Sequence, residues 1–452
     1  MLAIIPMVLT TFPEHESVSW LVLSNVSFFG VLIGQQLFSI FSNILSFTMG
    51  GAFRVGVQIE DKEVIDKSEP NWISFEKAYG TLRWLQVIAS SLNLIFAASI
   101  GYFALSNILE GTDGSTQVFG AFLVLLVTEF FFLAFGNYQI ALRGMNEVSL
   151  LNRWQTLMAL LSVCAGLAVL GSGGGILATT CAMQSVLLIH LLCMRKLARN
   201  ARGGVISCFS KLKFDRVIFE DAWRPLWKQS IVAFTALGFL QVVGVIFSFS
   251  AEPAEVGSYF LLLRLCGFVN SVSHEPLASV SPRFSRFIAQ GQRSEIADEV
   301  IVRMAICLGI YICGMFIVTF IVPTLLIFIG ANVVLPSLLA TATYCCFSCY
   351  AKYFTLGQRI TAFGNHIIQY WERVFACLIG LILIYFLAPR YGVLGIVLGF
   401  NFPYPFLFRL KSIFEASRFL DVSTSRMLLI GLMPAIYIAS CSLYILWGFS
   451  QP

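Results

Sequence analysis

Long apolar runs, each about 20 residues in length and separated by polar breaks, dominate this 452-residue sequence. Only 12% of the residues are charged, whereas a typical soluble domain carries about 25%. A soluble fold of this length would need a larger charged surface to remain in solution. The composition therefore excludes a soluble enzyme, a disordered protein and a nucleic-acid binder. Because the apolar runs are continuous and not short and alternating, they predict an all-α polytopic membrane protein and exclude an outer-membrane barrel.

Twelve apolar runs are long enough to cross a hydrocarbon core of roughly 30 Å. They cover residues 18–50, 79–108, 117–142, 152–170, 172–194, 224–249, 256–276, 300–322, 333–356, 367–388, 391–408 and 427–448. Residues 1–12 are also apolar but too short to span the membrane, so we interpret them as the back half of an incomplete first span. Counting that segment, the run at 427–448 is a thirteenth span.

The positive charges predict the orientation, because loops rich in Lys and Arg remain cytoplasmic. Nearly all of them fall in alternate breaks: Arg54, Lys62, Lys67, Lys77, Arg143, Arg153, Arg195, Lys196, Arg199, Arg202, Lys211, Lys213, Arg216, Arg283, Arg286, Arg293, Arg359, Arg409, Lys411, Arg418 and Arg426. The other breaks are short and nearly free of positive charge, with Arg390 as the exception. This pattern predicts a cytoplasmic N-terminus. The net charge of +5 is thus an orientation signal and not a sign of nucleic-acid binding.

The long basic break at 195–223 divides the sequence into two halves of six spans each. A short internal match supports the division, because Glu16-x-x-Ser19-Trp20 and Glu255-x-x-Ser258-Tyr259 enter corresponding spans. We predict two six-helix bundles, related by a pseudo-two-fold axis along the membrane normal around a central cavity, plus one extra C-terminal helix. The predicted domains are residues 1–210, residues 211–412, and a linker with the extra helix at 413–452.

Polar side chains inside the spans indicate a cavity, since hydrocarbon penalises polar groups that are neither paired nor hydrated. Three spans carry such side chains at helical spacing. In the span at 18–50 the candidates are Gln35, Ser39, Ser42 and Ser46, with Gln36 and Asn43 beside them. In the span at 79–108 they are Gln86, Ser90 and Asn93. In the span at 256–276 they are Arg264, Ser271 and Glu275, with Asn270 and His274 beside them. The alternative is that these groups only hydrogen-bond neighbouring helices.

Two charged residues stand out within the predicted spans. Arg264 is interpreted as the only Lys or Arg well inside an apolar span, and its guanidinium suits bidentate binding of phosphate or carboxylate. It could instead extend to the outer interface or pair with a carboxylate. Glu129 lies near the middle of the span at 117–142 and is a candidate for coupling transport to an ion. It could also be protonated and hydrogen-bonded, without a transport role.

The sequence carries no catalytic signature. There is no P-loop, no metal-binding cluster of His and Asp, and no large loop in which an enzyme could sit, so we expect no catalytic residue, metal or cofactor. The twelve Cys residues are scattered through apolar runs and form no zinc or disulfide pattern. An integral-membrane polysaccharide polymerase stays open as a less favoured alternative, although such enzymes carry one large outer loop.

Several stretches together are similar to one transporter family. They are Glu255-Val-Gly-Ser-Tyr-Phe-Leu-Leu-Leu-Arg264 followed by Ser281-Pro-Arg-Phe-Ser285, the start from Ile5-Pro6 to Trp20, Ala141-Leu-Arg-Gly144, and Pro389-Arg-Tyr-Gly392-Val-Leu-Gly395. The chain resembles polysaccharide flippases of the O-antigen translocase (Wzx) type, within the multidrug/oligosaccharidyl-lipid/polysaccharide exporter superfamily. The incomplete first span and the extra span at 427–448 depart from the family's twelve spans.

The resemblance implies a transporter and not an enzyme, located in the bacterial inner membrane. Its substrate would be an oligosaccharide linked to undecaprenyl pyrophosphate, an O-antigen or capsule repeat unit moved to the periplasmic leaflet by alternating access. Membrane lipids are further implied partners, and a proton or sodium gradient, a polysaccharide polymerase and chain-length proteins are candidates. A cation-coupled multidrug exporter of the same superfamily is the nearest alternative, and a flippase of peptidoglycan precursors is another.

Overall fold

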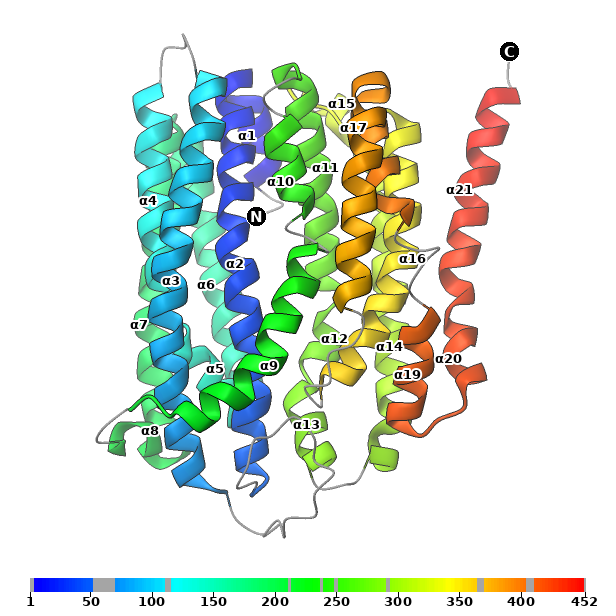
Figure 1. The fold of residues 1–452 in the computed structure, drawn as a ribbon. Helices are drawn as coiled ribbons and strands as arrows, with labels where there is room; N and C mark the ends of the chain where they lie inside the picture. Colours follow the sequence, from blue (N-terminus) through cyan, green and yellow to red (C-terminus); the bar gives the residue numbers. More distant parts are fainter. Residues whose placement is uncertain are drawn as a thin grey trace. The chain divides into compact units, whose positions relative to one another are not determined.

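The computed structural model describes residues 4–51, 70–109, 115–209, 213–235, 239–247, 251–289, 293–363, 370–403 and 410–450. In this part of the chain all regular structure is helical (Figure 1). Eight of the described helical segments are long and apolar enough to cross a membrane. The prediction of an all-α polytopic membrane protein is therefore confirmed.

The chain forms two compact units. Unit 1 comprises Met1–Ala233 and Ser281–Gly291, and unit 2 comprises Phe234–Val280 and Gln292–Pro452. The segment at 281–291 follows the start of unit 2 in the sequence but packs in unit 1, because its helix α13 (Ser281–Ala289) lies against α2 (Glu14–Met49). The predicted boundaries at 210 and 412 stay a prediction.

Unit 1 contains a core of aromatic and aliphatic side chains contributed by α2, α3, α5, α6, α7 and α9, with Phe41, Phe75 and Tyr79 almost completely buried. Its helices are α1 (Ile4–Thr11), α2, α3 (Trp72–Leu109), α4 (Ser115–Ala134), α5 (Asn137–Gly144), α6 (Val148–Gly171), α7 (Ile176–Asn200), η1 (Ala201–Gly204), α8 (Val205–Cys208), α9 (Arg216–Ala233) and α13. The turn between α6 and α7 has Gly173 at φ +81°, a left-handed conformation that favours glycine. The segment from Gly171 to Gly175 therefore forms a short turn between the two helices.

Unit 2 is also helical. Its elements are α10 (Phe239–Phe247), α11 (Pro253–Val272), α12 (Glu275–Ala278), α14 (Arg293–Phe316), the π-helical turn η3 (Ile317–Ile321), α15 (Val322–Phe328), α16 (Leu338–Ala362), α17 (Tyr370–Asn401), α19 (Leu410–Leu420), α20 (Thr424–Ile430) and α21 (Leu432–Ser450). Within α17, Gly392 at φ 53° and ψ −132° separates two helical parts that pack closely at Gly380 and Gly399. The two predicted runs at 367–388 and 391–408 thus correspond to the two parts of α17.

Two predicted runs differ from the structure in outline. The run at 224–249 was expected to be one span, but it contains the end of α9 and all of α10, and the unit boundary falls between Ala233 and Phe234. The run at 300–322 extends through η3 into α15. Pro323 lacks the N–H that an α-helix would bond to the carbonyl of Thr319, which accounts for the π-helical turn just before it.

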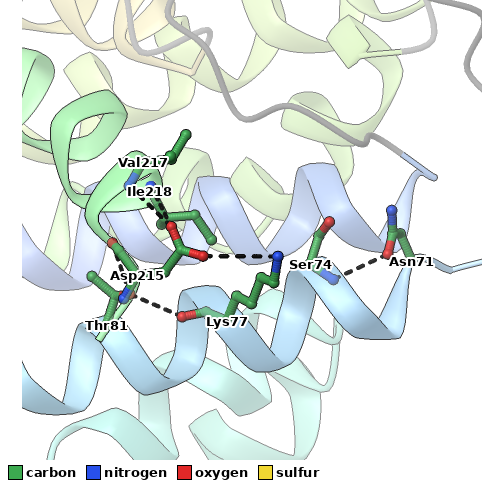
Figure 2. A network of polar contacts seen from close by, with 7 residues as sticks. All are labelled: Asn71, Ser74, Lys77, Thr81, Asp215, Val217 and Ile218. Atoms are coloured by element: carbon green, nitrogen blue, oxygen red, sulfur yellow. Dashed lines mark hydrogen bonds and ion pairs between the residues drawn. The ribbon is translucent and has the colours of Figure 1, made fainter. Parts of the chain in front are cut away.

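The start of α9 is fastened to α3 by a polar network (Figure 2). Asp215 caps α9, since its Oδ1 accepts hydrogen bonds from the N–H groups of Val217 at 3.0 Å and Ile218 at 3.2 Å. The N–H of Asp215 donates to Oγ1 of Thr81 at 3.0 Å, and its Oδ2 lies 3.8 Å from Nζ of Lys77. Further along α9, Gln229 donates to Ser39 on α2 at 3.2 Å. The helix that leads toward unit 2 is therefore held within unit 1 along its length.

Candidate functional site

The coupling candidate Glu129 lies in the interior of unit 1, where α4 meets α3 and α2. The side chains of Ser27 and Asn93 hydrogen-bond its carboxyl group. A methyl group placed on Gly30 would lie 2.9 Å from Nδ2 of Asn93 and 3.1 Å from Oε2 of Glu129. The glycine thus leaves room for the acid and the amide to approach the backbone of α2.

Two buried acceptors at this site have no hydrogen-bond partner in the described structure, Oε2 of Glu129 itself and Oδ1 of Asn93. Oε1 of Gln86, which lies earlier in α3, has none either. A buried acceptor left unsatisfied costs about 1–3 kcal/mol. A proton on the carboxyl group, a water molecule or a cation would remove part of this cost. The cluster of Ser27, Gly30, Asn93 and Glu129 is therefore chemically suited to bind a proton or a small cation, and we call it the acidic cluster.

The predicted polar face of α2 is largely occupied by contacts inside unit 1. Asn43 is buried and its Oδ1 accepts a hydrogen bond from Ser285 on α13 at 3.0 Å. The hydroxyl groups of Ser42 and Ser46 bond to carbonyls one turn earlier in α2, and Ser39 accepts from Gln229. Gln36 is buried and Gln35 is exposed. Of the six α2 side chains, Gln35 is the one whose exposure leaves it open to a ligand.

Of the residues predicted in the span at 256–276, His274 and Glu275 lie at the start of α12, whereas Arg264, Asn270 and Ser271 lie on α11 in unit 2. Arg264 sits near the middle of this helix and is half-buried, Asn270 is half-buried, and Ser271 is exposed. The hydroxyl of Ser271 donates to the carbonyl of Gly267. One stretch of α11 thus carries a guanidinium, an amide and a hydroxyl group, the chemistry that binds phosphate or sugar oxygens.

Lys352 is a second cationic side chain inside unit 2, and the sequence analysis missed it. It lies near the middle of α16 and is only 4% exposed, which corrects the interpretation that Arg264 is the only Lys or Arg well inside an apolar span. Its Nζ donates to Oδ1 of Asn270 at 2.8 Å and to the Asn270 carbonyl at 3.4 Å. Lys352 falls within the predicted span at 333–356, and α16 continues beyond that span to Ala362. The apolar and aromatic residues that follow Lys352 in the sequence indicate that it lies inside the span and not at its end.

The fold is similar to that of several solved transporters. A MATE multidrug transporter, DinF-BH, solved as a ligand complex, matches with a TM-score of 0.63 and 11% identity over 93% of this chain and 92% of that one. An inward-facing multidrug resistance MATE family transporter of the MOP superfamily matches with a TM-score of 0.54 and 11% identity, covering 97% and 94% of the two chains. A MOP superfamily transporter from Pyrococcus furiosus, described as having reverse polarity of its binding pocket, gives a TM-score of 0.57 and 13% identity over 97% and 92%.

No family model matches the sequence, and no curated protein matches it either. At identities of 11 to 13%, the structural similarities define the fold, which is that of MATE transporters.

Proposed function

We propose that this chain is a transporter that moves an oligosaccharide linked to undecaprenyl pyrophosphate from the cytoplasmic to the periplasmic leaflet of the bacterial inner membrane. The observation that carries this proposal is the cation Arg264 near the middle of α11, followed on the same helix by the polar groups of Asn270 and Ser271. The sequence motifs around Arg264 support the identity of the substrate, and the MATE fold supports alternating access as the mechanism.

The chemistry of such a substrate fits this helix. A sugar–pyrophosphate head cannot cross hydrocarbon unaided, because its charges and hydroxyl groups would lose their hydration. The guanidinium of Arg264 can replace that hydration with two parallel hydrogen bonds to phosphate oxygens. Asn270 and Ser271 can bond to further oxygens, while the polyprenyl tail stays in lipid. Gln35 of unit 1 is the proposed α2 contact, since it is exposed.

The acidic cluster of unit 1 is the proposed coupling site. A proton or sodium ion bound at Glu129 would neutralise the carboxylate and use acceptors that are unsatisfied in this structure. To test it, Glu129→Gln is compared with the wild type for dependence of transport on the proton gradient, using an uncoupler. The Gln variant is expected to transport independently of the gradient, and unchanged dependence would exclude Glu129 as the proton carrier.

A cation-coupled multidrug exporter is the second candidate function. Two of the solved proteins with this fold are multidrug transporters, one of them solved as a ligand complex, and Glu129 offers a negative charge to a cationic drug. Arg264 opposes this alternative, because a cation near the substrate path repels cationic amphiphiles. The sign of the charge on the substrate is thus the property that distinguishes the two functions.

The decisive experiment measures both activities in one strain. Cells that lack their own flippase are complemented with the wild type, Arg264→Ala or Arg264→Lys, and both surface polysaccharide and efflux of the cationic dye ethidium are quantified. We expect the wild type to restore polysaccharide, the Lys variant to restore part of it, and the Ala variant to restore none while still inserting in the membrane. Full polysaccharide with Arg264→Ala would refute the role of Arg264. Dye efflux without polysaccharide would favour the exporter.

A further inference from the structure

In the part of the chain that the structure describes, no carboxylate hydrogen-bonds or ion-pairs with Lys352. It is the only buried lysine among the residues that the structure describes. Its ammonium has two neutral acceptors, Oδ1 and the carbonyl oxygen of Asn270, and lies 5.1 Å from the centre of the Tyr311 ring. These contacts use hydrogen bonds and a π face, and none of them carries a formal charge.

The titratable neighbours of Lys352 do not supply a negative charge either. Arg359 on α16 is a like charge that disfavours the ammonium, and Cys307 on α14 is a thiol that carries no formal charge while it is protonated. The helices α17, α19 and α21 also pack against α16. Their titratable side chains in the described part of the chain have no hydrogen bond, ion pair or electrostatic interaction with Lys352: Tyr370, Glu372, Arg373, Cys377, Tyr385, Arg390, Tyr391, Lys411, Glu415, Arg418, Tyr437 and Cys441.

Opposing effects therefore act on the charged form of this side chain. Burial and the nearby Arg359 raise the free energy of the ammonium, since water is replaced by protein and a like charge is close. The oxygens of Asn270 and the face of Tyr311 lower it. The charged and neutral forms are for that reason closer in free energy than they are in an exposed lysine.

We infer that Lys352 is a proton-binding site of unit 2, whose amine takes up a proton and releases it during the transport cycle. On uptake, the nitrogen lone pair forms an N–H bond with a proton delivered by water, and on release that bond breaks and the proton returns to water. No other bond changes. The inference holds whatever the substrate is, because it rests on the surroundings of Lys352 and not on Arg264.

The protonation state of Lys352 would act on α11 through Asn270. The protonated ammonium makes charge-assisted hydrogen bonds to Asn270, which are roughly twice as strong as the bonds of a neutral amine. Loss of the proton therefore loosens the contact between α16 and α11. Since α11 also carries Ser271 and Arg264, the proton is linked to the helix with the proposed substrate contacts.

The test is a proton titration of the purified full-length protein in detergent, with proton uptake measured in weak buffer by a pH indicator. We expect the wild type to bind about one more proton per chain than Lys352→Met at a pH well below about 10.4, the value at which an exposed lysine titrates. The matched control is Lys411→Met, which removes an exposed lysine on α19. It controls for the general effect of removing one lysine from the chain.

A difference for Lys352→Met that falls at about pH 10.4, where an exposed lysine titrates, would overturn the inference, because Lys352 would then be permanently charged. No difference down to about pH 4 would also overturn it, since an exposed lysine stays protonated there and this one would have to remain neutral. Lys352→Arg provides a second variant in case Lys352→Met does not fold. Arginine keeps its charge, so this variant should also lack the proton-uptake step that the wild type shows. In the otherwise native chain, Asn270→Asp places a carboxylate beside the amine of Lys352. The carboxylate stabilises the ammonium, so the proton-uptake step should move to higher pH. An unmoved step would contradict the inference.

Discussion

The two units place opposite chemistry inside the same kind of helical scaffold. The interior of unit 1 holds the carboxyl group of Glu129 together with buried amide oxygens that have no partner in the described structure. The interior of unit 2 holds the cations Arg264 and Lys352, and there an amide oxygen, that of Asn270, accepts from the cation. Unit 1 is thus suited to gain a positive charge and unit 2 to gain a negative one or to lose a proton. This difference between the two interiors depends on a few charged side chains and not on helix packing alone. Reversing those charges should therefore abolish it.

The largest effect is expected from Glu129→Lys, which introduces a cation into unit 1. The new ammonium would lie beside Asn93 and Gly30 without a described carboxylate to compensate it, and an uncompensated buried charge costs about 3–5 kcal/mol. We expect the protein to be lost from the membrane or its thermal unfolding in detergent to occur at much lower temperature. Glu129→Gln is the control, because it keeps the shape and should cost less than about 1 kcal/mol. Equal stability of the two variants would show that unit 1 tolerates a positive charge at this position.

A smaller effect is expected in unit 2 from Asn270→Leu, which removes the acceptor of Lys352. Leaving a buried donor unsatisfied costs about 1–3 kcal/mol. Ser271→Ala on the same helix changes an exposed hydroxyl and should cost less than about 0.5 kcal/mol. Unfolding of the double variant Asn270→Leu/Lys352→Met completes a double-mutant cycle, and most of the lost stability should return in it. Additive losses would mean that Asn270 and Lys352 do not depend on one another.

The third prediction separates packing residues from ligand contacts on α2. Asn43→Ala removes the acceptor of the buried Ser285 hydroxyl and should cost about 1–2 kcal/mol in unfolding. Gln35→Ala alters an exposed side chain, so we expect a stability change below about 0.5 kcal/mol but reduced surface polysaccharide. The same two measurements are made on both variants. A stability loss for Gln35→Ala with normal polysaccharide would reassign Gln35 to packing.

Local signals explain what the sequence could predict about the fold. Apolar runs depend on neighbouring residues, which is why the helical membrane fold could be predicted from the sequence. The unit boundary between Ala233 and Phe234 was not predicted, because it depends on which helices pack together and not on the hydropathy of residues 224–249.

Distant contacts explain what the sequence could not predict about the candidate site. Asn43 is bonded to Ser285, which is 242 residues away, and hydropathy cannot distinguish that bond from a cavity-facing position. Lys352 hydrogen-bonds Asn270, which is 82 residues away on another helix. Polar residues within spans could therefore be located from the sequence, but their partners, and with them the division between packing and binding, depend on the tertiary structure.

The smallest effect is expected at Asp215, where α9 is fastened to α3 at the edge of unit 1. Asp215→Asn keeps an oxygen that can cap Val217 and Ile218 but loses the ion pair with Lys77, whose side chain is 57% exposed. Exposed pairs contribute about 0–1 kcal/mol and are screened by salt, so the Asn variant should match the wild type at high ionic strength. Asp215→Ala loses the cap as well, which costs typically about 1 kcal/mol at any salt concentration.

Thermal unfolding at low and high salt measures both Asp215 variants, and the difference between them isolates the cap. If Asp215→Ala unfolds like Asp215→Asn under all conditions, the cap does not hold α9 to α3. The attachment of α9 to unit 1 would then depend on its contacts with α2, such as that between Gln229 and Ser39. The helix α9 ends at Ala233, at the boundary between the two units. The measurement therefore shows how much the Asp215 cap contributes to holding this boundary helix in unit 1.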